Sequence, residues 1–99
     1  MKYTIHTYAD AEASARAVAN LILEKATSKK RLSQNLNLAI SGGSTPRYLF
    51  TILADLPEYR TEIPWEVVRF FWVDERCVEP TDAESNFGMT YDALLQYAF

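Results

Sequence analysis

The stretch that decides the fold is Ser41-Gly42-Gly43-Ser44-Thr45-Pro46. The apolar run Leu36–Ile40 leads into this stretch, and a helical pattern that begins at Pro46 leads out of it. Two consecutive glycines let the backbone bend tightly and approach a ligand closely, because neither glycine carries a Cβ. We expect Thr45 to be the N-cap of the helix and Pro46 to be its first residue. Strand, glycine turn and helix in this order are typical of an anion-binding turn, for which phosphate is the best-suited ligand.

The turn alone does not identify a nucleotide-binding site. It lacks the Lys-Ser/Thr ending of a Walker A loop and the G-x-G-x-x-G spacing of a dinucleotide-binding turn. A plain strand-to-helix connection is the alternative interpretation, because Gly, Ser and Thr are common in turns. To distinguish an anion-binding turn from a plain connection, we therefore consider the other residues that are expected at the same edge of the sheet.

Size and composition limit the classes of protein to consider. The chain has 99 residues, enough for one domain at most, and its net charge of −3 argues against a nucleic-acid partner. No apolar run approaches the ~20 residues that cross a bilayer, and the first residues lack the apolar core of a signal peptide. The lone cysteine, Cys77, and the lone histidine, His6, form no metal-ligand pattern, so we expect a packing role for Cys77 and a structural or solvent-exposed role for His6. These features predict a cytoplasmic protein with no membrane partner and no zinc site.

Three strands are predicted to alternate with three helices. Tyr3–Tyr8 alternates and is rich in β-formers, so it is predicted to be the first strand. Asp10 can cap the helix that follows, and Ser85 can cap the last one. The apolar stripe of the first helix comprises Ala11, Ala15, Val18, Ile22 and Ala26, widened by Leu21.

The most apolar run, Val67–Val73, is predicted to be a strand that is covered on both faces. It ends abruptly in Asp74-Glu75-Arg76. The element order predicts an α/β fold with a doubly wound, mostly parallel sheet and helices on both faces. In such sheets ligands bind at the carboxyl ends of the strands, so the glycine turn and the charged trio are expected to face one ligand. A surface ion-pair cluster is the alternative interpretation of the trio.

Three signatures in this order resemble the amino-terminal part of the 6-phosphogluconolactonases. They are the glycine turn Ser41–Pro46, the run from Phe70 to Val78, and the pair Ser85-Asn86. The related glucosamine-6-phosphate deaminases typically carry Asp-Glu-Tyr and Ser-Tyr at the last two places, so both differences favour the lactonases. The resemblance covers essentially the whole chain, which is expected to be a single, partial, Rossmann-like domain.

The resemblance implies hydrolysis of 6-phosphogluconolactone to 6-phosphogluconate without a metal or cofactor. It implies that the substrate phosphate is held by four residues of the turn (Gly42, Gly43, Ser44, Thr45). Arg76 is expected to contact the same phosphate or the sugar acid, and Asp74 is expected to orient the substrate. The family's proposed base is a histidine in a later Gly-Asp-Gly-His stretch that this chain lacks, so we expect the chain to be inactive alone.

Two other functions stay open at this point. One is an amino-sugar phosphate isomerase-deaminase, against which Arg76 and Asn86 argue. The other is a non-catalytic sugar-phosphate sensor, which would need a DNA-binding segment before the first strand. Because the Val67–Val73 strand would lie at an edge of the sheet, we also expect self-association or low stability of the isolated chain.

Overall fold

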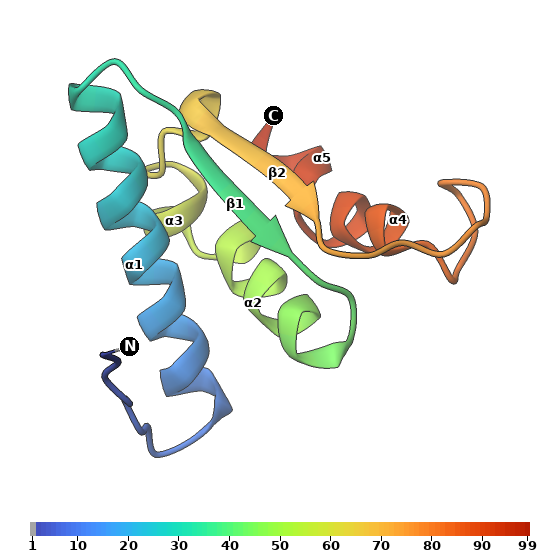
Figure 1. Cartoon of the computed structure of the whole chain (residues 1–99), viewed down its shortest axis with the longest axis horizontal. Coiled ribbons are helices and arrows are strands. Elements are labelled where there is room, and N and C mark those ends of the chain that lie inside the picture. The colour runs from blue at the N-terminus through green and yellow to red at the C-terminus, as the bar shows by residue number, and fades with distance from the viewer. Residues whose placement is uncertain (1) are drawn as a thin grey trace.

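The computed structural model describes residues 2–99, in which two strands and a set of helices form one body (Figure 1). The elements in chain order are helix α1 (Ala11–Arg31), strand β1 (Leu36–Ile40), helix α2 (Ser44–Asp55), helix α3 (Pro57–Arg60), the 3₁₀ turn η1 (Trp65–Val67), strand β2 (Val68–Trp72), helix α4 (Asn86–Thr90), the π-helical turn η2 (Tyr91–Leu95) and helix α5 (Gln96–Ala98).

The two strands pair in parallel, as the sequence predicts. Their register runs from Leu36 opposite Val68 to Ile40 opposite Trp72. The amide of Val73 donates to the carbonyl of Ile40 (2.9 Å), which extends the pairing by one residue. The carboxyl ends of β1 and β2 therefore meet at one edge, where the glycine turn and the charged trio begin (Figure 1).

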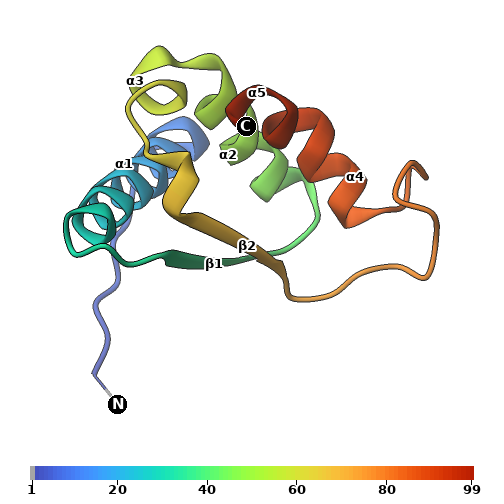
Figure 2. The same cartoon turned by 90° about the horizontal axis from the view of Figure 1, so that it is seen from above.

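The helices within residues 2–99 all lie on one face of the strand pair (Figure 2). Alternate residues of each strand, such as Leu38 and Phe70, pack against the core, whereas Arg69 and Phe71 on the other face are exposed. Within residues 2–99, β2 is thus covered on one face, not on both as its composition suggests. The α/β class and the parallel sheet are confirmed.

The core lies between the strands, α1, α2 and the carboxyl-terminal helix. Its largest fully buried apolar side chains are Tyr59, Phe50, Leu53 and Leu94. Tyr59 donates its hydroxyl to Asn20 Oδ1 (2.8 Å), so the buried phenol keeps a hydrogen-bond partner. This core fixes α2 against the sheet, and α2 in turn fixes the glycine turn.

The predicted first strand is wrong. Residues 2–8 carry no strand, and their side chains are exposed. The alternating pattern is present, but a strand forms only when another strand accepts its backbone hydrogen bonds, and residues 2–99 offer none to this segment. The sheet within residues 2–99 therefore has two strands, where the sequence predicts three.

The first helix follows the prediction at its start and departs from it along its length. Asp10 caps it by accepting from the amide of Ala13 (2.8 Å), as expected. Ile22 and Ala26 are buried, but Val18 and Leu21 are 41% and 50% exposed, so Leu21 does not widen the buried stripe. No helix within residues 2–99 combines the length and hydropathy that a bilayer crossing requires.

Candidate functional site

The turn after β1 is built around Gly43. Gly43 has φ 111° and ψ 174°, a combination that is essentially restricted to glycine, and it occupies the N-cap position of α2. The helix begins at Ser44, so the predicted N-cap at Thr45 is wrong, and Pro46 is the third helical residue. The reason is that Gly43 turns the chain into the helix by its own backbone, with no side-chain cap.

This geometry leaves a set of backbone donors at the start of α2. The first amide that donates within the helix is that of Arg47, which bonds to the carbonyl of Gly43 (3.2 Å). The amides of Gly43, Ser44 and Thr45 precede it and have no acceptor in the helix ladder. They stand at the positive end of a 12-residue helix dipole, the arrangement that suits an anion.

Asp74, two residues after the end of β2, is linked to the glycine turn by Asn86. The Asn86 side-chain amide donates to both the carbonyl and the carboxylate of Asp74, at 3.2 Å each. The same side chain fills the space over Gly42, where a built Cβ would overlap Asn86 Oδ1 and lie 2.7 Å from its Cγ. Asp74 and the turn thus lie on either side of Asn86, at the edge that the sequence predicts.

The middle residue of the charged trio has a different task. The Glu75 carboxylate accepts hydrogen bonds from the amides of Phe87, Asn86 and Arg76 and from the Ser85 hydroxyl. These bonds, the one from the Phe87 amide first, lower the pKa of Glu75 to about 2 against a smaller opposing effect of burial. Glu75 is therefore an anion at neutral pH whose lone pairs are engaged, and it is not available as a proton acceptor.

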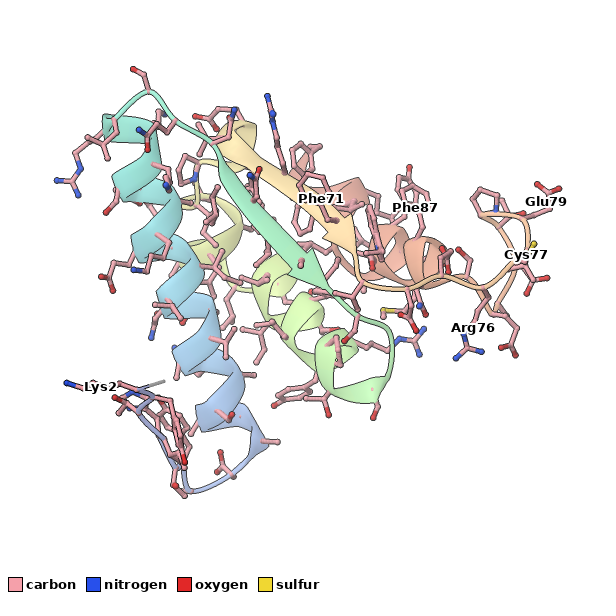
Figure 3. The ribbon with its side chains drawn as sticks, in the orientation of Figure 1. Lys2, Phe71, Arg76, Cys77, Glu79 and Phe87 are labelled. Carbon is pink, nitrogen blue, oxygen red and sulfur yellow. The ribbon has the colours of Figure 1, made fainter. Side chains whose placement is uncertain are left out.

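Arg76 and Cys77 lie on the loop that projects from the body (Figure 3). The Arg76 guanidinium is 3.5 Å from Glu84 Oε2, and both side chains are exposed. The loop therefore forms an ion pair at Arg76, as the alternative interpretation of the trio expects. Cys77 is exposed, so the predicted packing role for it is wrong, because it follows the end of β2 and faces no core.

Two cavities lie beside the start of α2. One, of about 570 Å³, lies between α1 and α2 and has mostly apolar walls, with Ser41, Ser44 and Thr45 at its polar end. The other, of about 490 Å³, is lined by Arg47 together with Asp82 and Phe87. Neither cavity is lined by Asp74 or Arg76. The turn and Asp74 are brought together through Asn86, whereas the structure does not place Arg76 in a cavity with the turn.

Sequence reasoning missed the roles of Glu75 and Asn86. Asn86 enters the sequence analysis only as part of a signature, and Glu75 only as one charge of three. The available signal is a carboxylate shortly after the end of β2, followed 10 residues later by Ser85, the N-cap of α4. Within residues 2–99, no three His, Cys, Asp or Glu side chains gather as a metal site.

Comparison with known proteins gives consistent matches. The model of the family described as glucosamine-6-phosphate isomerases/6-phosphogluconolactonase matches residues 9–98. The 6-phosphogluconolactonase of Treponema pallidum is 50% identical over 82 residues, which are 83% of this chain and 33% of that protein. The Haemophilus influenzae 6-phosphogluconolactonase is 40% identical over 67 residues, 68% of this chain and 28% of that protein. The chain therefore spans about a third of the length of these curated relatives.

Solved structures agree with the sequence matches. The crystal structure of the devB protein superposes with a TM-score of 0.85 at 37% identity, covering 93% of this chain and 37% of that one. The 6-phosphogluconolactonase from Trypanosoma brucei superposes with a TM-score of 0.80 at 31% identity, covering 97% and 36%. Fold, strand-end site and relatives lead to one assignment: this chain belongs to the glucosamine-6-phosphate isomerase/6-phosphogluconolactonase family.

Proposed function

We propose that this chain forms the phosphate-binding part of a 6-phosphogluconolactonase, which hydrolyses the ester of 6-phosphogluconolactone to 6-phosphogluconate. The observation that carries the proposal is the meeting of the glycine turn and Asp74 at one sheet edge, with Asn86 between them. The relatives named above are lactonases rather than deaminases, which favours ester hydrolysis over deamination.

In this proposal the backbone holds the phosphoryl end of the substrate. The amides of Gly43, Ser44 and Thr45 donate to phosphate oxygens, and the absence of a side chain at Gly43 leaves room for the phosphate to approach them, while Gly42 leaves room for Asn86. Arg76 adds a guanidinium that matches two phosphate oxygens at once. Asp74, held by Asn86, accepts hydrogen bonds from sugar hydroxyls and so orients the ring.

Ester hydrolysis also needs a base that activates water and a donor that stabilises the carbonyl oxyanion. Glu75 is committed to hydrogen bonds within the chain, and His6 lies on the exposed segment before α1. The proposal therefore assigns binding to this chain and proton transfer to residues outside it. A cytoplasmic location remains a prediction of the sequence. So does self-association, for which the 66% exposure of Val73 beside β2 offers a surface.

The test compares a phosphorylated with an unphosphorylated ligand. The 99-residue chain should bind 6-phosphogluconate more tightly than gluconate in calorimetric titration, and inorganic phosphate should compete. Arg76→Ala should raise the Kd for 6-phosphogluconate by about tenfold, as expected for loss of one charge-assisted contact, and should leave the Kd for gluconate unchanged.

Arg31→Ala is the matched control, because it removes the same charge from an exposed position in the last turn of α1. It should change neither Kd. Joining the chain to the unmatched part of the Treponema pallidum relative should give lactone hydrolysis that the chain alone lacks. Equal affinity for the two ligands would refute the phosphate site.

A further inference from the structure

One carboxylate fastens the long loop after β2 to the start of the carboxyl-terminal helix. Glu75 Oε1 accepts from the Asn86 amide (2.6 Å), and Oε2 accepts from the Phe87 amide (2.9 Å) and from Ser85 Oγ (3.0 Å). Ser85 Oγ in turn accepts from the Gly88 amide (3.0 Å), and Ser85 is only 2% exposed. Glu75 therefore closes the loop Arg76–Glu84 at its base.

What Glu75 fastens is the residue that separates Asp74 from the glycine turn. The Asn86 amide is bound by Glu75, while the Asn86 side chain reaches Asp74 on one side and covers Gly42 on the other. Asn86 is also the first residue of α4, so its place depends on where that helix begins. The position of the helix start and the position of the Asn86 side chain are thus set together.

We propose that Glu75 is a positioning residue, which fixes the start of α4 and thereby holds Asn86 between Asp74 and Gly42. It sets the spacing of the two strand-end segments that bind the sugar phosphate. The ligand part of this inference rests on the proposed function, whereas the geometric part does not. The ionised state of Glu75 agrees with this role, because a carboxylate with a pKa of about 2 accepts hydrogen bonds at every physiological pH.

The contacts explain why shape and charge are both required. A carboxylate offers two oxygens that both accept, whereas a carboxamide offers one acceptor and one donor. Glu75→Gln therefore turns the group at one oxygen position into a donor that faces an N–H or O–H donor. Glu75→Asp keeps the charge but shortens the reach by one methylene, so it cannot serve the same donors.

The experiment uses the 99-residue chain and two readouts. Amide hydrogen exchange at Asn86, Phe87 and Gly88 should become at least tenfold faster in Glu75→Gln and in Glu75→Asp. The NMR signals of the Asn86 side-chain amide should shift in both variants. The Kd for 6-phosphogluconate should rise about tenfold, with a smaller change for inorganic phosphate, which does not need the Asp74 side of the site.

Glu79→Gln is the matched control, since Glu79 lies on the same projecting loop and loses the same charge (Figure 3). It should leave the amide exchange rates and the Kd for 6-phosphogluconate within twofold of the values for the parent chain. The NMR signals of the Asn86 side-chain amide should stay at their original positions. The proposal is overturned if Glu75→Gln leaves the Asn86 signals in place, or if they move while the Kd for 6-phosphogluconate stays the same. If the parent chain binds no 6-phosphogluconate, the proposed function fails, and the Asn86 signals alone then decide the positioning role.

Discussion

The turn after β1 and the loop after β2 reach the same sheet edge by different means. The first has three residues, Ser41 to Gly43, and is shaped by backbone conformation with no side-chain cap. The second runs from Val73 to Ser85 and is held by the carboxylate of Glu75. The turn after β1 can present backbone amides because Gly43 has no side chain. The loop after β2 presents the Asp74 side chain, whose position depends on other side chains that hold the loop in place.

The first prediction concerns the stability of the backbone-shaped turn after β1. Gly43→Ala puts a Cβ on a residue at φ 111°, which should lower the free energy of unfolding by about 1–3 kcal/mol. The space around this Cβ is otherwise open, with Pro46 Cδ at 3.9 Å, so the cost is conformational. Urea unfolding of the 99-residue chain measures it.

Ser44→Ala is the control for this prediction, because the exposed Ser44 is next along the chain and gives α2 no side-chain cap. It should change the stability by less than about 0.5 kcal/mol. Equal stability of the Gly43 and Ser44 variants would show that the turn does not depend on the unusual conformation of Gly43.

The second prediction tests whether the two segments touch through Asn86. Gly42 does not share the positive φ of Gly43, so its lack of a side chain serves space instead of conformation. Gly42→Ala should cost about 1–3 kcal/mol, as overpacking does, because the new Cβ displaces Asn86 from Asp74. In an Asn86→Ala background the cost should fall by at least half.

A double-mutant cycle gives the result as a coupling energy, expected at about 1 kcal/mol or more for residues in contact. The control combines Gly42→Ala with Ser44→Ala. The effects of these two substitutions on the free energy of unfolding should be additive. Additive effects of Gly42→Ala and Asn86→Ala would mean that turn and loop are independent.

The third prediction concerns pH and only the loop. The pKa of Glu75 is lowered in the fold, so its contribution is complete above about pH 4.5 and is lost as the pH falls towards about 2. The amide signals of Asn86 and Phe87 should move over that range, whereas the amide of Ser44, which has no carboxylate partner, should not follow them. Glu75→Gln should abolish the change, and a pH response that survives this substitution would contradict the assignment.

The same contrast explains what the sequence could predict. β1, β2 and the glycine turn follow from short-range patterns, because apolar runs and glycines act on their immediate neighbours. The parallel pairing follows from the alternation of strands and helices along the chain. The end of α2 at Asp55 is of this kind, since Pro57 disfavours helix in the residue before it. Of these features, the glycine turn is the part of the candidate site that consists of backbone.

The rest depends on residues that are far apart in the sequence. The Tyr3–Tyr8 pattern predicts a strand, but pairing needs a neighbour that no local pattern supplies. Except for the adjacent Arg76 amide, the hydrogen-bond partners of Glu75 lie 10 to 12 residues later, and only the placement of α4 brings them within reach. The residue type of Thr45 predicts a cap for α2, but the backbone of Gly43 determines where the helix begins.

The smallest effect is expected from breaking the exposed ion pair between Arg76 and Glu84. Arg76 and Glu84 are paired at 3.5 Å with their side chains 60% and 70% exposed, and such pairs contribute about 0.2–1 kcal/mol. Glu84→Gln should therefore leave the stability unchanged within error. It should lower the Kd for 6-phosphogluconate about two- to threefold, because Arg76 no longer has to leave a carboxylate to reach the phosphate.

The gain in affinity of Glu84→Gln for 6-phosphogluconate should become smaller as salt is added, since ions screen exposed charges. Glu79→Gln on the same loop should show a smaller gain, and Glu84→Gln combined with Arg76→Ala should show none. If Glu84→Gln tightens binding equally with Arg76 present or absent, the carboxylate acts by general repulsion of the phosphate. The loop after β2 would then contribute Asp74 and no guanidinium, and the backbone amides of the glycine turn would bind the phosphate alone.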